Sequence, residues 1–270
     1  MPSSLALGRY ALRLVTAFTY AVMLLPIFFI GWLSFFRNEL LSFPPEGYTL
    51  RWFQQLWLQP QFADGFMTSL EVGIVAMLGG LALGIPASLA LARSDFRGKE
   101  AVTALLTSPL IVPSIVIGTA LYIFFIQIEI ATEWPLTGSV IGLGLAHILV
   151  TIPWTVRLLT ASLEGLDRSL EEAAMNLGAD RWRTLLHVTL PVIRPAVVAA
   201  ALFGFVVSFG NLEISLFLVA PGTTTLPIAI LQYLQWKIDP TIAAISLIQI
   251  LIIAVGMLVT NRFVRLSQVV

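Results

Sequence analysis

Apolar positions along this chain gather into six long runs, separated by shorter stretches in which the charged residues collect. The hydrocarbon core of a bilayer takes about 20 mostly apolar residues per helix, and each run reaches that length. We therefore predict one transmembrane domain over residues 1–270 with six membrane-spanning helices. The predicted spans are 11–36, 66–92, 101–126, 138–161, 192–220 and 240–262.

The composition agrees with lipid as the main solvent of this chain. Of its 270 residues, 58% are hydrophobic and 11% are charged, whereas soluble domains carry about a quarter charged residues. The mean hydropathy is +0.92, too high for a single water-soluble core. Cysteine is absent, which excludes disulfides and thiolate sites, and the two histidines lie too far apart to suggest a metal site.

Lysine and arginine distribute unequally between the two sides of the predicted membrane domain. With both termini inside, twelve basic residues face the cytoplasm and three face outward, a strong positive-inside bias. The outward set is Arg37, Arg51 and Lys237. The inward set is Arg9, Arg13, Arg93, Arg97, Lys99, Arg157, Arg168, Arg181, Arg183, Arg194, Arg262 and Arg265. We expect the first run to stay as an uncleaved span, because it is too long for a signal peptide.

The polar stretch between the fourth and fifth predicted spans has a helical period of its own. Ser169 followed three residues later by Glu172 has the form of a capping box, and Gly178 can end a helix in the left-handed conformation. The pattern predicts a short amphipathic helix over 166–178, which either contacts another protein or lies on the inner membrane face. Its apolar stripe consists of Leu166, Leu170, Ala173 and Leu177.

Residues in and after this helix resemble a known motif. The chain has Glu172-Ala173-Ala174, three residues, Gly178, nine residues and then Val188-Thr189-Leu190-Pro191. This resembles the EAA motif of binding-protein-dependent ABC transporter permeases, with Val188 where isoleucine is usual. The resemblance implies a coupling helix that docks into a groove on an ATPase subunit. The coupling residues it implies are Leu166, Leu170, Glu172, Ala173, Ala174, Leu177 and Gly178.

The resemblance extends over nearly the whole chain, including "RSDFRGK" at 93–99, "PLIVPSIVIG" at 109–118 and the stretch 208–231. The chain is most similar to the second permease subunit of spermidine/putrescine-type importers, a group that also includes permeases for opines, aminoethylphosphonate, thiamine and ferric iron. Polyamine permeases carry paired acidic residues after "SF", where this chain has Gly210 and Asn211. The resemblance favours a polyamine or a related amine as the substrate and leaves the other solutes open.

The same resemblance implies a fold and an assembly. The fold is that of type I importer (MetI-like) permeases, with spans two to six as the core and the first span wrapping a partner. The assembly is a second permease subunit, two ATP-binding subunits and a periplasmic binding protein, in the bacterial inner membrane. No cofactor is expected in this chain, because ATP and magnesium bind to the partner ATPase.

Polar residues in the fifth predicted span are the candidates for a substrate path. Ser208, Asn211 and Ser215 share one helical stripe, which fits either a helix contact or a translocation cavity. Glu213 is an intramembrane carboxylate, which costs ~2.5–3.5 kcal/mol at a bilayer centre. It fits attraction of a cationic substrate, a salt bridge to a partner subunit, or a solvated helix end. His147 in the fourth predicted span is interpreted as a helix-packing residue.

Two other classes of function compete with a permease. An enzyme would need catalytic groups, but neither lysine precedes Ser or Thr, and HExxH and GxSxG do not occur in the sequence. A P-loop is therefore impossible in this chain, and any ATPase must be another protein. A secondary transporter would show inverted repeats and several intramembrane charges, and neither is evident. The sequence alone does not identify the substrate.

Overall fold

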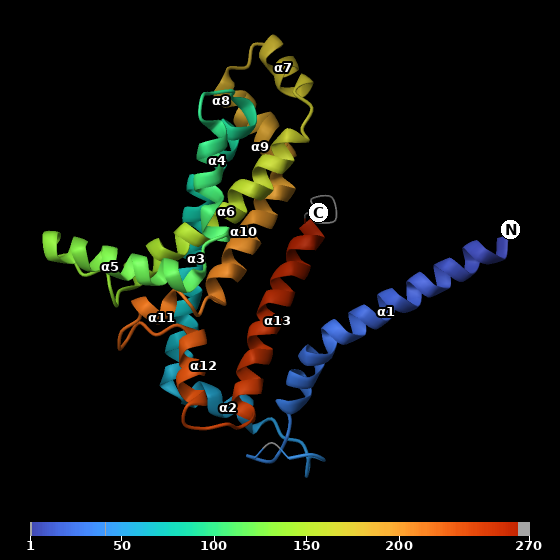
Figure 1. The fold of residues 1–270 in the computed structure, drawn as a ribbon, viewed down its shortest axis with the longest axis vertical. Coiled ribbons are helices and arrows are strands. Elements are labelled where there is room, and N and C mark those ends of the chain that lie inside the picture. The colour runs from blue at the N-terminus through green and yellow to red at the C-terminus, as the bar shows by residue number, and fades with distance from the viewer. Residues whose placement is uncertain (1, 41, 264–270) are drawn as a thin grey trace. The chain divides into compact units, whose positions relative to one another are not determined.

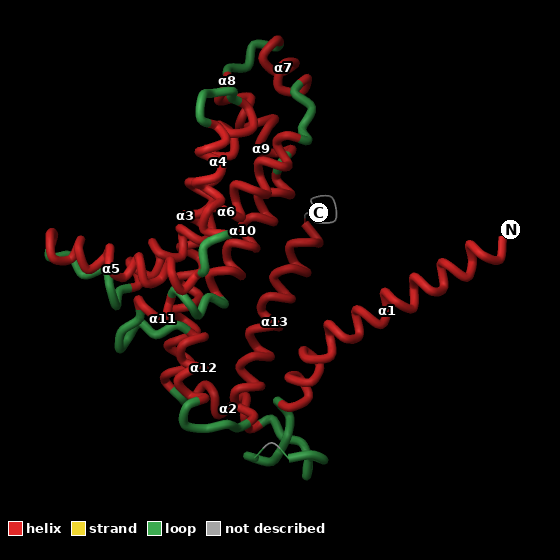
Figure 2. The backbone as a smooth tube through the Cα atoms, in the orientation of Figure 1, coloured by secondary structure: helices red, strands yellow, loops and turns green. Residues whose placement is uncertain are grey.

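The computed structural model describes residues 2–40 and 42–263, and these residues form helices and loops without a named strand (Figure 1 and Figure 2). Within them, five helices are long and apolar enough to cross a membrane, and a bent pair of shorter helices makes a sixth candidate. These numbers agree with the six predicted spans. Arg265, which contributes to the predicted basic asymmetry, lies outside the described residues.

The chain divides into two compact units. The first comprises Met1–Pro60 and Gln232–Ile252. It contains α1 (Pro2–Leu33), α2 (Arg51–Leu58) and the first part of α13 (Pro240–Phe263). Its apolar centre is small and aromatic, with Phe36, Trp52 and Leu56 fully buried. The Trp52 Nε1–H donates to the carbonyl oxygen of Phe36 at 2.6 Å, which satisfies the buried indole.

The second unit, Gln61–Leu231 and Ile253–Val270, contains all of the predicted site residues. Its longest helix is α3 (Pro60–Arg93), whose first residue belongs to the other unit. The other helices are α4 (Lys99–Thr107), η1 (Ser108–Leu110), α5 (Ser114–Thr132), α6 (Val140–Glu164), α7 (Ser169–Asn176), α8 (Arg181–Thr184), η2 (Leu185–Thr189), α9 (Leu190–Val192), α10 (Arg194–Phe209), α11 (Ser215–Leu218) and α12 (Leu226–Leu234).

Helices α3, α6 and α10 run together, while α5 extends away from them (Figure 1). Small residues allow α3 and α6 to approach closely, because Gly80 and Gly84 of α3 face Thr151 and Thr155 of α6. The Thr151 hydroxyl donates to the carbonyl oxygen of Ala76 on α3 at 3.0 Å. Lipid supplies no hydrophobic force between helices, so such close contacts and interhelical hydrogen bonds hold this bundle together.

Two predicted spans are not continuous helices. The run 101–126 is divided between α4–η1 and α5, because Pro113 has no N–H to donate and disfavours helical backbone at Val112. The run 192–220 ends as a helix at Phe209, where Gly210 follows, and only the short α11 resumes it. Apolar composition predicts membrane residence correctly here but does not reveal these breaks in backbone geometry.

Candidate functional site

Helix α7 occupies the predicted 166–178 segment but is shorter, and its start differs from the prediction. Ser169 is the first helical residue, so it cannot serve as the cap of the proposed capping box. The carboxylate of Asp167 instead accepts the backbone N–H of Ser169 at 3.0 Å. This hydrogen bond lowers the pKa of Asp167. The start of α7 is therefore stabilised by an acidic residue two positions before it.

The end of α7 confirms the prediction for Gly178, whose φ is +90°. The N–H of Gly178 donates to Met175 and that of Ala179 donates to Ala174, at 3.0 and 3.1 Å. These two bonds form a Schellman motif, in which a left-handed residue closes the last turn. Glycine adopts this φ without the steric penalty of a Cβ, so the chain turns sharply back toward α8.

The predicted apolar stripe divides into a buried and an exposed part. Leu166 precedes α7 and is 9% exposed, in a cluster with Ala92, Leu163 and Ile193. Leu170 and Leu177 are 46% and 90% exposed. Of the remaining predicted coupling residues, Glu172, Ala173 and Gly178 are exposed and Ala174 is partly buried. Helix α7 thus presents apolar side chains outward while Leu166 anchors its base.

A neighbouring carboxylate that the motif does not include attaches α7 to the bundle. Glu171 Oε2 lies 2.9 Å from Arg93 Nε, and the two side chains are 15% and 18% exposed. The Thr189 hydroxyl donates to Glu171 Oε1 at 2.7 Å, and Arg93 Nη1 donates to the carbonyl oxygen of Leu163 at 2.8 Å. The sequence analysis gave Glu171 no role.

After α7 the chain passes through a sequence of short helical pieces. Asp180 caps α8 by accepting the N–H of Arg183 at 2.7 Å, and η2 is a five-residue π-helix. The pair 181–192 and 194–209 is bent by 71°. Pro195 explains the bend, because it lacks the N–H that would continue the helical ladder to Pro191. The fifth span therefore does not continue stiffly from the α7 region.

The candidate path segment lies where α10 ends. Gly210 follows the last helical residue, and the Asn211 Oδ1 accepts the N–H of Ile214 at 3.0 Å. The Ser215 hydroxyl donates to the backbone carbonyl of Asn211 at 2.9 Å. These local bonds satisfy backbone groups that the interruption frees from the helical ladder, which is the condition for a helix break at membrane depth.

His147 of α6 joins the two serines of that segment, as expected of a helix-packing residue, although its serine partners were not predicted. Its Nδ1 lies 2.7 Å from Ser208 Oγ and its Nε2 lies 3.1 Å from Ser215 Oγ. All three side chains are at most 3% exposed. The structure therefore places the two serines against α6, while Asn211 is partly buried and Glu213 is exposed. Assignment of these four residues to a substrate path stays a prediction.

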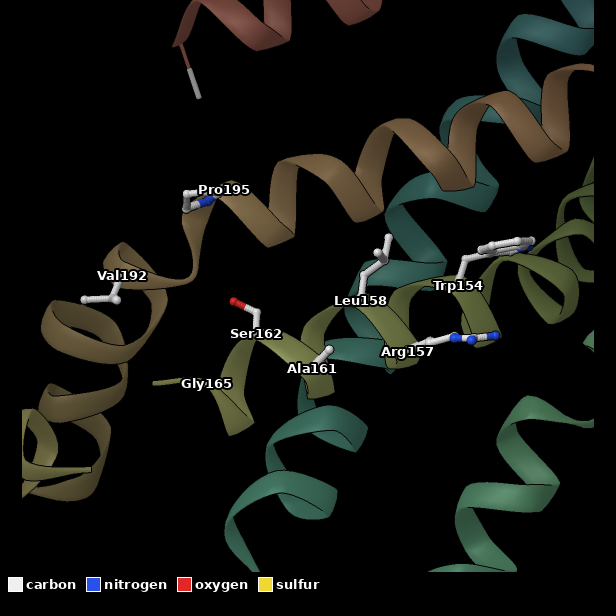
Figure 3. Close-up of a pocket in the computed structure, with 8 residues that line it drawn as sticks. All are labelled: Trp154, Arg157, Leu158, Ala161, Ser162, Gly165, Val192 and Pro195. Carbon is white, nitrogen blue, oxygen red and sulfur yellow. The ribbon is translucent and has the colours of Figure 1, made fainter. Parts of the chain in front are cut away.

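A cavity of about 520 Å³ lies between the later part of α6 and the α9–α10 bend (Figure 3). Arg157 and Trp154 point in one direction from α6 in this view, and Ser162 extends toward the side of Val192 and Pro195. None of the predicted site residues lines this cavity. In the part of the chain that the structure describes, no group of three or more His, Cys, Asp or Glu residues could hold a metal ion.

Comparisons with known proteins cover both candidate segments. A family model described as "Binding-protein-dependent transport system inner membrane component" matches residues 80–268. The putrescine transport system permease protein PotI of Escherichia coli (strain K12) is 30% identical over 230 residues, which are 85% of this chain and 80% of PotI. The molybdenum transport system permease protein ModB of Haemophilus influenzae is 33% identical over 183 residues, covering 62% of this chain and 77% of ModB.

A solved structure shares the fold despite low sequence identity. A chain of a bacterial ABC transporter involved in the import of the acidic polysaccharide alginate superposes with a TM-score of 0.74 at 14% identity. The match covers 97% of this chain and 98% of that one. The similarity of fold therefore includes α1 as well as the bundle that carries α7.

Proposed function

Since this chain belongs to the binding-protein-dependent transport system inner membrane components, the permease subunits of ABC importers, we propose that it forms the translocation path for a small amine. The solute is delivered by a periplasmic binding protein, and ATP hydrolysis by a separate subunit drives its passage. The permease itself is non-catalytic.

The observation that carries this mechanism is the surface of α7. A helix of eight residues exposes Leu170 and, just after its end, Leu177, although water is an unfavourable neighbour for both. Force from ATP hydrolysis must reach a permease through a contact, and a short capped helix with exposed apolar side chains suits such a contact. The partner is the ATP-binding subunit. The alternative, a helix resting on lipid, explains the apolar side chains but not the match to the EAA motif.

An amine substrate is supported by similarity to PotI and by the exposed carboxylate of Glu213. Gly210 and Asn211 stand where polyamine permeases carry paired acidic residues, so the proposal includes amines related to the polyamines as well as putrescine itself. The second candidate is a different solute, and it is supported by the similarity to ModB, whose name refers to molybdenum transport. A secondary transporter is the remaining, weaker alternative.

The proposed orientation places both termini and α7 in the cytoplasm of a bacterial inner-membrane protein. It is supported by the basic residues, twelve of which then face inward. A second permease subunit, homologous or identical, completes the assembly. The described side chains of α1 from Gly8 to Phe29 are exposed, which fits a helix covered by that subunit and by lipid.

Gentle affinity purification from the native membrane tests the assignment. The tagged chain should bring down an ATP-binding subunit and a second permease. Proteoliposomes containing this complex and its binding protein should then take up labelled putrescine in preference to labelled molybdate. Recovery of a monodisperse, transport-competent chain without an ATPase would overturn the assignment in favour of a secondary transporter.

A further inference from the structure

We propose that the Glu171–Arg93 ion pair is the mechanical link through which displacement of α7 is passed to α3. This inference rests on the proposed function, because it assumes that an ATPase moves α7. It assigns a positioning role to two residues outside the EAA motif.

Helix α7 is joined to three elements at one point. Glu171 pairs with Arg93 at the end of α3 and accepts a hydrogen bond from Thr189 in η2. Arg93 also donates to Leu163 of α6 at 2.8 Å. A second arginine reinforces the junction, since Arg168 Nη2 donates to the carbonyl oxygen of Ala92 at 3.2 Å. A push on α7 therefore reaches the end of α3 directly.

The alternative route from α7 to α10 runs along the backbone and is interrupted. From α7 the chain enters α10 only through α8, the π-helix η2 and α9, and then through the 71° bend before Arg194. A bent junction whose hydrogen-bond ladder is broken by Pro195 transmits force poorly compared with a continuous helix. Helix α3, by contrast, is a single helix of 34 residues, about 50 Å, in which Pro86 removes one hydrogen bond of the ladder without ending the helix.

Helix α3 contacts other elements of the bundle at several points along its length. Near Arg93, Ala92 packs in the apolar cluster with Leu163 and Ile193. Farther along, Gly80 and Gly84 lie against α6. Near its other end, the Ser69 hydroxyl accepts the N–H of Leu226, the first residue of α12, at 2.8 Å. Movement of α3 as a rod therefore reaches elements at both ends of the bundle.

The Glu171–Arg93 pair is costly to break, which suits a contact that has to hold while α7 moves. Both side chains are largely withdrawn from water and carry additional hydrogen bonds, unlike surface pairs, which contribute about 0–1 kcal/mol. Removing one partner leaves the other charge buried without compensation. The Lys99–Asp95 pair is the matched contrast on the loop after α3, at 3.5 Å, with the Asp95 side chain fully exposed.

The test uses the full complex of this chain with its permease partner, ATPase and binding protein in proteoliposomes. Glu171→Gln and Arg93→Gln should assemble but lose stimulation of ATP hydrolysis by the binding protein, by about tenfold. The charge exchange Arg93→Glu/Glu171→Arg should recover part of it. Asp95→Asn is the control and should leave stimulation unchanged. Normal stimulation in both single variants would overturn the proposal, as would loss of assembly in the single and exchanged variants alike.

Measuring the distance between α3 and α7 distinguishes an ion pair that transmits movement from one that only stabilises the fold. This chain contains no cysteine, so once any cysteines of the partner subunits are replaced, spin labels at Ser94→Cys and Ser169→Cys report the α3–α7 separation. The distribution should stay narrow and unshifted between the nucleotide-free and ATP–vanadate states, and Glu171→Gln should broaden it. A shift in the unsubstituted background, or no broadening in the variant, would overturn the link. If the unsubstituted chain binds no ATPase, the proposed function itself fails before any variant is made.

Discussion

The imidazole of His147 and the hydroxyl of Ser208 lie 2.7 Å apart and join α6 to α10 across 61 residues of sequence. The second ring nitrogen contacts Ser215 beyond the interruption of the helix, so one side chain spans the break. A buried polar cluster of this kind is favourable only while each member keeps its partner. The arrangement therefore ties the geometry of the candidate path segment to α6.

Replacement of His147 by alanine should destabilise the folded chain. The change leaves the hydroxyl of Ser208 without its imidazole partner and opens a cavity, and a lost buried partner costs about 1–3 kcal/mol. Thermal unfolding of the detergent-solubilised complex measures the effect. His187→Ala is the control, because His187 is exposed and contacts only the backbone of Arg183 among the described hydrogen bonds. Equal melting temperatures for the two variants would contradict the role given to His147.

Enlarging Gly84 should separate α3 from α6. A Cβ at this position would collide with the side chain of Thr155, and overpacking of a close contact costs about 1–3 kcal/mol. Gly84→Val should therefore lower the yield of folded chain in the membrane, measured by fluorescence-detected size exclusion. Gly8→Ala, where no atom lies within 4 Å, should leave the yield unchanged. A normal yield for the valine variant would argue against tight α3–α6 packing.

Gly178 can be compared with a second glycine of the same conformation. Gly178 and Gly98 have φ of +90° and +91°, and a Cβ on either meets no atom within 4 Å. Gly178→Leu and Gly98→Leu therefore carry a similar backbone penalty, about 1–2 kcal/mol. Only the change at Gly178 should reduce ATP hydrolysis stimulated by the binding protein, because only Gly178 closes α7. Equal loss of stimulation in both variants would show that backbone strain alone explains the effect and would contradict a specific role for Gly178.

The acidic pH dependence of stability should involve Asp239. Burial opposes its ionisation, but hydrogen bonds from Thr241, Lys237 and Tyr233 outweigh burial and lower its pKa. Ionised Asp239 therefore stabilises the fold above the ordinary carboxyl pKa of about 4, and this stabilisation is lost as pH falls through the lowered pKa. Its hydrogen bond also raises the pKa of Lys237, whose contribution is present at neutral pH and lost at strongly alkaline pH.

The measurement is the melting temperature of the purified chain from pH 3 to pH 8, with and without Asp239→Asn. The variant should melt lower near neutrality, and the difference should shrink toward the acidic end. Asp95→Asn should show no such convergence, because Asp95 is fully exposed. A difference that stays constant across the range would remove the ionisation of Asp239 from the explanation.

The family and the all-α membrane architecture could be predicted from sequence, and the comparisons confirm them. The number of apolar spans agrees with the five long helices and the bent pair of the structure. These features depend on composition and on a motif contiguous in sequence. Apolar composition predicts one continuous span through Gly210, because apolar residues continue on both sides of it, although a glycine at that position allows a bend. Ser208 and Ser215 nevertheless lie on the same side, as the predicted helical stripe requires, since both hydroxyls contact His147. The role of Glu171 was not predictable either, because its partner Arg93 is 78 residues away.

Glu213 is the exposed carboxylate of the candidate path. If it attracts a cationic solute, Glu213→Gln should lower uptake of labelled putrescine by proteoliposomes while assembly and basal ATP hydrolysis stay normal, because the amide keeps the shape and removes the charge. Glu46→Gln, an exposed carboxylate in the loop before α2, is the matched control and should leave uptake unchanged. A salt bridge to the partner permease predicts a different result, in which the yield of assembled complex falls. A solvated helix end predicts no change in either quantity, and unaltered uptake would remove Glu213 from the path.

Raising the salt concentration sharpens the test, because an exposed charge that steers a cation is screened over about 8 Å at 0.15 M ionic strength. Uptake by the unsubstituted complex should therefore fall with salt more steeply than uptake by Glu213→Gln.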